Sequence, residues 1–337
     1  MYLYDAEGHD REVELTEDRL QSIGDRSLVW IDISARTEEE IRRVAEVLSL
    51  ETSSLHDLLE PKPKPRLDNY GSYFQFSLVP PPSAAVRELA DGSAPAENGE
   101  NAKTQTSEQS RIDFVVGERW LLTVHDEELS YLQGFRGQDK AETDIGALSP
   151  QALAASLLDW HLETYFEEVA RIELIVDRLD QYILAEPSSK SLLGRMAAVR
   201  RRISRVRKIL VVQRPVFYGL SRPDVTKVAE STASNHYELL MSRFERAVDE
   251  VERTRELILG SFDLFTSRIS QQTNDLVKAL TFFTVIIGCV AAVAGLFGMN
   301  FDPPFFRTGT AGFFAVTGGL LIVALVGWAW AKHKHWV

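Results

Sequence analysis

Ala279-Leu-Thr-Phe-Phe-Thr-Val-Ile-Ile-Gly-Cys-Val-Ala-Ala-Val-Ala-Gly-Leu-Phe-Gly298 is a run of 20 residues without a charged side chain. A second uncharged run, of 21 residues, extends from Ala311 to Ala331. Each run is long enough to cross a hydrocarbon core of about 30 Å at 1.5 Å per helical residue. Buried core helices are the weaker interpretation, because uncharged runs of this length are rare in soluble domains. The sequence therefore predicts two transmembrane helices.

The flanks of the two runs indicate their orientation in a membrane. Only residues 300–310 connect the runs, so the two spans form a hairpin whose outer ends lie on the same side. Lys and Arg concentrate on the outer flanks, whereas the connection contains two charged residues, Asp302 and Arg307. Cytoplasmic flanks are enriched in Lys and Arg, and Trp gathers at membrane interfaces. We therefore expect both termini in the cytoplasm, with an aromatic belt at that end formed by Trp328, Trp330 and Trp336.

Composition excludes several classes of function. The formal net charge of −12 argues against a nucleic-acid-binding surface and is compatible with a protein that handles cations. The one cysteine, Cys289, lies inside the first apolar run, so a single chain can form no disulfide and no Cys-based zinc site. The N-terminal residues lack a basic segment followed by an apolar core, and we expect the first span itself to direct membrane insertion. His56, His125 and His161 are isolated and no nucleotide-binding loop is present, so we expect no enzyme.

Residues 1–150 alternate strand-like and helix-like patterns, which predicts a cytoplasmic α/β domain. Ser27–Ile33 is β-rich, and Thr37 with Glu40 forms a capping-box pattern that opens a helix. Residues 80–110 are rich in Pro, Ala, Gly, Ser and Glu, a composition that cannot bury a core, and we interpret them as a mobile excursion. The remaining expected elements of this domain are a short helix over Ser53–Leu59, a strand over Tyr70–Val79 and a hairpin over Arg111–His125 that turns at Gly117-Glu118.

Residues 151–235 predict an antiparallel helical region. Apolar residues recur at three- and four-residue spacing from Ala152 to Ala185, and a second, Arg-rich helix extends from Ser191 to Arg214. The bases of this second helix suit either an anionic-lipid or nucleic-acid surface or a solvated face that pairs with acids of the preceding helix. We favour the pairing, because the two helices are adjacent in the chain. The bases concerned are Arg195, Arg200, Arg201, Arg202, Arg205, Arg207 and Lys208, and the acids are Glu163, Glu167, Glu168, Glu173, Asp177 and Asp180.

Residues 236–278 predict a cytoplasmic stalk helix that continues into the first span, residues 279–299. A heptad stripe of apolar residues is interrupted only by Arg255 and Thr273, and no proline breaks the pattern. One helix from about His236 to Gly298 would be on the order of 95 Å long. Its stripe needs other helices of the chain, or copies of itself, to cover it. The stripe comprises Met241, Phe244, Val248, Val251, Ile258, Phe262, Phe265, Ile269, Leu276 and Leu280.

Small and polar residues follow one face of the first span. Their spacing is three to four residues, with one longer step between Asn274 and Thr281. Small residues on a membrane helix favour close helix packing, whereas a stripe that ends at an exposed amide, Asn300, favours a water-filled pore. The candidate pore-lining residues are Asn274, Thr281, Thr284, Gly288, Ala291 and Gly295.

Gly298-Met299-Asn300 stands directly at the exit of the first span, and a basic tail over residues 332–337 follows the second, residues 311–331. This arrangement resembles the CorA-type divalent-metal transporter family. The stretch from Gln272 to Thr281 is similar to the family's junction between stalk and membrane. The resemblance covers residues 236–337 well and the N-terminal part loosely.

The resemblance implies a homopentameric funnel in the cell (inner) membrane, with an α+β cytoplasmic domain, a long stalk helix and an all-α membrane part. It implies a selectivity filter at Gly298, Met299 and Asn300 and an apolar constriction at Leu280. It also implies a cytoplasmic metal-sensing carboxylate at Asp263, where a divalent ion between subunits holds the closed state. Divalent cations are then substrate and regulatory ligand, the lipid bilayer and other copies of the chain are the partners, and no cofactor is expected.

Asn300 suits a hydrated ion by its chemistry. A ring of amide oxygens accepts hydrogen bonds from the water shell of a cation, and Mg²⁺ gives up its water reluctantly. Asn also favours helix ends, which is the structural interpretation of the same residue. Asp302, in the connecting segment, would raise the local cation concentration. The sequence thus favours passive entry of Mg²⁺, with Co²⁺ and Ni²⁺ as further substrates.

Two departures from the family pattern leave alternatives open. The first span lacks the usual proline, with Gly288 in place of a bulky residue, and residues 300–310 lack the usual glutamate. The zinc-transporting, ZntB-like branch of the family, which is potentially proton-coupled, is the first alternative, although Met299 favours Mg²⁺. A membrane-tethered helical scaffold or sensor without transport is the alternative from another class, and it predicts that Asn300 is dispensable.

Overall fold

The computed structural model describes residues 2–5, 11–12, 27–62, 64–81, 111–126, 128–138, 144–185, 190–222, 233–298 and 309–333. The expected excursion over residues 80–110 lies outside this part of the chain except for its first two residues. Met299, Asn300 and Asp302 also lie outside it. The chain divides into two compact units, residues 1–179 with 190–261 and residues 180–189 with 262–337.

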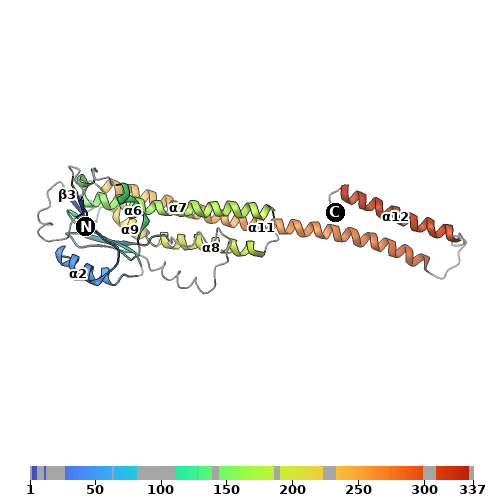
Figure 1. The fold of residues 1–337 in the computed structure, drawn as a ribbon, viewed down its shortest axis with the longest axis horizontal. Helices are drawn as coiled ribbons and strands as arrows, with labels where there is room; N and C mark the ends of the chain where they lie inside the picture. Colours follow the sequence, from blue (N-terminus) through green and yellow to red (C-terminus); the bar gives the residue numbers. More distant parts are fainter. Residues whose placement is uncertain are drawn as a thin grey trace. The chain divides into compact units, whose positions relative to one another are not determined.

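The first unit contains a seven-stranded mixed sheet (Figure 1). Its strand order is β2-β1-β3-β7-β6-β5-β4, in which only β3 and β7 pair in parallel. The expected strand over Tyr70–Val79 is shorter than predicted, because Gly71 adopts a positive φ of 80° in a turn that separates two strands. The strands are β1 Tyr2–Asp5, β2 Arg11–Glu12, β3 Ser27–Ile33, β4 Leu67–Asn69, β5 Phe74–Leu78, β6 Ile112–Val116 and β7 Trp120–His125.

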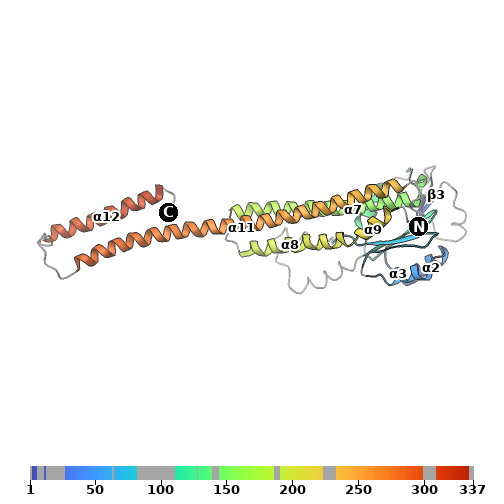
Figure 2. The ribbon, with the colours of Figure 1, turned by 180° about the vertical axis from the view of Figure 1, so that it is seen from behind.

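Strand β3 shows how the sequence determines both faces of the sheet. Val29, Ile31 and Ile33 point to one face, where they form a core with apolar residues of helices α2 (Glu38–Val47) and α3 (Thr52–Leu59). Trp30 points to the opposite face, where its ring contacts Phe135 of helix α6 (Ser130–Gln138). Because both faces are covered, β3 has no regular alternation of apolar and polar residues, as is typical of strands in buried sheets (Figure 2).

The turn between β6 and β7 requires a glycine at position 117. A Cβ atom there would lie 2.3 Å from the Trp120 side chain. The backbone N–H of Gly117 donates to the Trp120 carbonyl at 2.9 Å and closes the expected hairpin. The expected capping box at Thr37 takes a different form, since its hydroxyl donates to the Glu40 carboxylate at 2.6 Å and not to the backbone.

Mainly long helices follow the sheet in the described part of the chain. Helix α7 (Pro150–Ala185) is followed by the antiparallel α8 (Lys190–Val211), a short α9 (Arg214–Leu220) and α11 (Ser234–Phe297). A 3-10 turn, η1 (Asp144–Ala147), precedes α7, and α12 (Gly309–His333) follows α11. Within the first unit, α7, α8 and the start of α11 lie side by side (Figures 1 and 2). The expected α+β body, long helix and pair of C-terminal apolar helices are confirmed.

The bases of α8 pair with both neighbouring helices. Arg202 forms a buried ion pair with Glu168 of α7, with 2.5 Å between Nε and Oε1, as the sequence predicts. Arg207 pairs with Glu252 of α11 at 2.6 Å, so the prediction that it pairs with α7 is wrong. The reason is that α8 packs against two helices, and only one of them precedes it in the chain.

A buried polar network attaches α7 to the sheet. Gln213 lies at its centre, and its Nε2 donates to the Tyr165 hydroxyl at 2.8 Å. The Tyr165 hydroxyl donates to the carbonyl of Val79, at the end of β5, at 2.7 Å. His161 Nε2 lies 3.2 Å from Gln213 Oε1. These contacts pair buried polar groups that would otherwise destabilise the fold.

The heptad stripe of α11 is buried at several positions in the first unit, is partly buried from Phe262 to Ile269, and is exposed at Leu276 and Leu280. Phe244, Val251 and Ile258 are buried, whereas Leu276 and Leu280 are each 68% exposed in a single chain. Two polar residues also belong to the buried face: Thr254 donates to Glu173 Oε1 at 2.7 Å, and Ser261 donates to the Leu257 carbonyl at 3.2 Å. The stripe therefore has two parts, of which the second is open to another partner.

Candidate ion-conduction pathway

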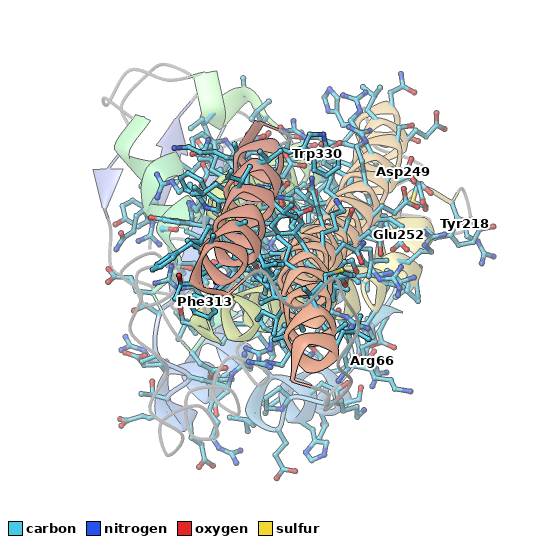
Figure 3. All side chains as sticks on the ribbon, turned by 90° about the vertical axis from the view of Figure 1, so that its right-hand side faces the viewer. Arg66, Tyr218, Asp249, Glu252, Phe313 and Trp330 are labelled. Carbon is cyan, nitrogen blue, oxygen red and sulfur yellow. The ribbon has the colours of Figure 1, made fainter. Side chains whose placement is uncertain are left out.

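The second unit contains two helices that are long and apolar enough to cross a membrane, the C-terminal part of α11 and the whole of α12. Their apolar windows are not buried within the chain, unlike the core helices of a soluble protein. Phe313 and Trp330, near the two ends of α12, expose 67% and 49% of their surfaces (Figure 3). Lys332 lies 5.3 Å from the Trp328 ring, a cation–π contact at the end where the interfacial belt is expected.

Helix α12 packs on one face of α11. A Cβ atom on Gly327 would lie 3.2 Å from Ile286 Cδ1 and 3.6 Å from Phe282 Cζ, so a glycine allows the two helices to approach closely. The residues of α11 that are partly buried in this part recur at three- and four-residue spacing. They are Ala279, Phe282, Ile286, Val290 and Val293.

The predicted pore-lining stripe lies on the opposite face of α11. With 3.6 residues per turn, the stripe is centred about 180° from the face that α12 covers. Every member of the stripe is exposed in the single chain. The small residues of the stripe therefore do not pack against α12. Close packing of helices within one chain does not explain the stripe. The stripe comprises Asn274, Thr281, Thr284, Gly288, Ala291 and Gly295.

Val277 belongs to the same face, although sequence reasoning missed it. It lies three residues after Asn274 and four before Thr281, and so fills the longer step in the stripe. Its side chain is 53% exposed. Leu280 is also exposed but lies about 60° to one side of the centre of the face. The three- and four-residue spacing is a signal that identifies Val277. Its side chain, however, is neither polar nor small like those of the other residues of the stripe.

The threonine hydroxyls on this helix have a defined orientation. Thr284 Oγ1 donates to the Leu280 carbonyl at 2.8 Å, and Thr273 Oγ1 donates to the Ile269 carbonyl at 2.9 Å. A hydroxyl has one proton and two lone pairs. Because the proton is used within the helix, Thr284 offers its remaining lone pairs outward, and these attract cations or donors from water.

Helix α11 ends where the predicted filter begins. Its last residue is Phe297, and the N–H of Gly298 still donates to the Ala294 carbonyl at 3.0 Å. Gly298 is therefore the helix end, which agrees with the preference for glycine at that position. The roles of Met299 and Asn300 in a filter, and that of Asp302 in attracting cations, stay predictions.

Asp263 is exposed on α11, and no hydrogen bond or ion pair reaches it from the described residues. Lack of a partner costs an exposed carboxylate little free energy, so Asp263 needs no partner within a single chain. Across the described ranges, no group of three or more His, Cys, Asp and Glu side chains could hold a metal ion. A metal site at Asp263 would thus need ligands from another copy.

Further acids lie on α11 before Asp263. Asp249 and Glu252 project from one side of the helix (Figure 3), and Glu256 follows at a helical spacing. Hydrogen bonds from Arg207, together with its charge and that of Arg255, hold the pKa of the Glu252 carboxyl below its usual value. The side chains of Asp249 and Glu256 are exposed, and the exposed Arg246 and Arg253 lie beside them at helical spacing.

The α/β body, the long helix and the two apolar helices define a membrane protein with a large domain outside the bilayer. A family model for CorA-like Mg²⁺ transporter proteins matches residues 25–334, and the chain belongs to this family of divalent-metal transporters. The cobalt/magnesium transport protein CorA of Thermotoga maritima is 26% identical over 185 residues, a match that covers 55% of this chain and 52% of that protein.

Two solved structures show the same fold. The complete CorA magnesium transporter of Methanocaldococcus jannaschii matches with a TM-score of 0.71 at 17% identity, over 100% of this chain and 98% of that one. The ZntB cytoplasmic domain of Vibrio parahaemolyticus matches with a TM-score of 0.55 at 12% identity, over 80% of this chain and 98% of that one. The match to the family model confirms the expected family, together with its class of activity, which is transport and not enzymatic catalysis.

Proposed function

We propose that the chain forms a homopentameric channel in the cell (inner) membrane, with both termini in the cytoplasm, through which hydrated Mg²⁺ enters. The observation that carries the proposal is the uncovered stripe of the first span, opposite the face that α12 covers. A stripe on the free face of a hairpin meets its equivalents only when copies assemble around a common axis. Thr284, Gly288 and Ala291 would then line a space wide enough for a cation with its water.

The driving force is the membrane potential. A divalent ion that crosses the whole field gains roughly 4.6 kcal/mol per 100 mV, twice the value for one charge. The amide of Asn300 would select the ion at the entrance through its water shell, because Mg²⁺ keeps several waters when it is bound. Val277 and Leu280 would form an apolar constriction that closes by excluding water. Co²⁺ and Ni²⁺, which are also divalent, are the further substrates we expect.

We further propose that cytoplasmic Mg²⁺ regulates the channel through Asp263. Its carboxylate is exposed and unpaired among the described residues, and an ion held between copies would neutralise the mutual repulsion of these acids. Loss of that ion at low internal Mg²⁺ would release the closed state. No resident cofactor takes part in this scheme.

The test is metal flux into proteoliposomes that contain the purified protein, measured in parallel with Mg²⁺- and Zn²⁺-sensitive dyes, for wild type and Asn300→Ala. Mg²⁺ entry that the substitution abolishes is the expected result. Entry of Zn²⁺ alone would identify the zinc branch, although neither span contains the Asp, Glu or His that a proton relay would need. If correctly inserted protein passes neither ion, the transport proposal is wrong and a membrane-tethered scaffold or sensor is the remaining function.

A further inference from the structure

Helix α8 contains bases that meet no acid in the described part of the chain. Its sequence has eight Lys and Arg residues and no Asp or Glu. Arg202 pairs with Glu168 of α7. Arg207 pairs with Glu252 of α11. The pairing that the sequence favours therefore accounts for only some of these bases. The side chains that no hydrogen bond or ion pair reaches from the described residues are Arg195, Arg200, Arg201, Arg205 and Lys208.

Three of these bases form one stripe, which we call the basic face. Arg205 and Lys208 follow Arg201 at four and seven residues, so the three lie within about 60° around the helix axis and about 10 Å along it. Arg201 and Lys208 are exposed, and Arg205 is partly exposed. The opposite side of α8 is buried at Ile203 and Leu210. The basic face is therefore the side of α8 that is open to solvent in the single chain.

The charges of the basic face repel one another. Arg201 precedes Arg205 by four residues and Lys208 follows it by three, and like charges at these spacings destabilise a helix. No acid of α8 offsets this repulsion. An anion bound across the three side chains would do so. The planar guanidinium group presents a fork of donors that matches the oxygens of a phosphate, and Lys adds a compact positive charge.

The charge of the rest of the chain limits the size of the anion. The formal net charge of the protein is −12, so a long polyanion such as a nucleic acid would be repelled beyond the basic face. A short chain of phosphates needs only the three bases. The triphosphate of a nucleotide is such a chain, and its oxygens are common ligands of Mg²⁺. A bound Mg²⁺ cancels two of its negative charges and so weakens its attraction to the bases.

We propose that the basic face of α8 binds the triphosphate chain of a nucleotide, and that it binds the metal-free form more tightly than the Mg²⁺ complex. This site lies within the first unit and is separate from the pore stripe and from Asp263. Nucleotide binding requires no transport. Failure of this proposal would therefore leave the proposed channel unaffected, and failure of the channel would leave this site unaffected.

The experiment is equilibrium dialysis of ATP against the full-length protein in nanodiscs of phosphatidylcholine. One series contains a chelator and the other saturating Mg²⁺ at matched ionic strength. Wild type should bind metal-free ATP, and Mg²⁺ should raise the Kd by about tenfold, since each exposed ion pair that is lost accounts for about threefold. Inorganic tripolyphosphate should displace ATP, whereas adenosine, which has no phosphate, should not.

The variant Arg201→Gln/Arg205→Gln should raise the Kd for metal-free ATP by about tenfold, because the two losses add. The matched control is Arg171→Gln/Arg253→Gln, which removes the same charge from exposed side chains. Arg171 and Arg253 each pair with acids of their own helix. The control should bind ATP as wild type does. Both variants should keep the wild-type Tm and number of copies.

No binding of metal-free ATP to wild type, or equal loss of binding in the two double variants, would overturn the proposal. Equal affinity with and without Mg²⁺ would overturn the preference for the metal-free form. Complete loss of binding in nanodiscs that contain phosphatidylglycerol would show that lipid headgroups hold the basic face instead. Fewer copies in Arg201→Gln/Arg205→Gln would show that the face joins copies of the chain, which also contradicts the proposal.

Discussion

His161 is a buried ionisable side chain whose protonation opposes folding. Burial lowers the pKa of its imidazole to about 4, from a usual value near 6.5, and the bond with Gln213 only partly offsets this effect. Between pH 6.5 and 4 the unfolded chain binds a proton that the folded chain does not. The free energy of unfolding therefore falls as the pH is lowered through this window, by up to about 1.4 kcal/mol per pH unit.

Thermal unfolding of the detergent-solubilised protein at pH 7.5 and pH 5 tests this prediction. Replacement by glutamine, which is neutral at both values and keeps a donor for Gln213, should make the difference in Tm between the two pH values smaller than in wild type. Other acid effects are common to both proteins and cancel. Equal differences for wild type and His161→Gln would show that His161 does not titrate in this range.

Asp263 permits a second prediction for a single residue. Asp263→Asn keeps the size of the side chain and removes its charge, so it should raise the cytoplasmic Mg²⁺ concentration needed for inhibition by about tenfold. Asp275→Asn is the control, because Asp275 is exposed on the same helix and pairs with Lys278 at 2.8 Å. The two variants are compared by measuring metal flux as a function of the internal Mg²⁺ concentration. Equal curves for the two variants would contradict a special role for Asp263.

Single residues differ in how far their roles can be predicted from sequence. Thr284 and Gly288 are identified by spacing alone, because the helical period places them on one face whatever surrounds the helix. Arg268 is not, since its partner is a main-chain carbonyl 84 residues away, and a carbonyl leaves no trace in sequence. Sequence likewise cannot show that Asp249 and Glu256 are exposed whereas Glu168 is buried in an ion pair with Arg202. That difference depends on how the three helices pack.

Among the elements, the pair formed by α11 and α12 depends on a glycine. A leucine at position 327 would place its side chain where Ile286 and Phe282 now lie, so the helices would have to separate. Gly327→Leu should lower the Tm of the assembled protein and its yield in membranes. Gly319→Leu is the control on the same helix, where a Cβ would meet no atom within 4 Å in the single chain. Equal stability of the two variants would contradict the packing described.

Helices are the elements that the sequence predicts best. The sequence predicts a helix from about His236 to Gly298, and α11 extends from Ser234 to Phe297, because an uninterrupted apolar period specifies a helix independently of its neighbours. The strands are predicted in type but less well in length. Of residues 70–79 only Phe74–Leu78 form a strand, because a turn at Gly71 precedes it, and a turn of this kind depends on one dihedral angle and not on a pattern.

At the scale of the whole molecule, the exposed apolar residues of α11 predict self-association. Leu276 and Leu280 continue the heptad stripe beyond the region that α7 and α8 cover. Native mass spectrometry of the solubilised protein should show five copies. Replacement of both leucines by glutamine should shift the population toward smaller species. A monomer in wild type would contradict the assembly, because a single hairpin cannot enclose a pore.

Family, fold class and the position of the spans follow from sequence, because length, charge and a short motif at the end of a span are local properties. The number of copies and the arrangement around the pore are not local, since they depend on surfaces that one chain leaves open. The central claim of the account concerns one such surface, the face of α11 opposite α12.

Cysteine accessibility tests this claim most directly. In a Cys289→Ser background, which removes the one native cysteine, Ala291→Cys lies on the open face and Val293→Cys on the face that α12 covers. A charged, thiol-reactive reagent applied from the water side should block metal flux through Ala291→Cys and leave flux through Val293→Cys unchanged. Block of both variants, or of Val293→Cys alone, would place the pathway elsewhere and contradict the account.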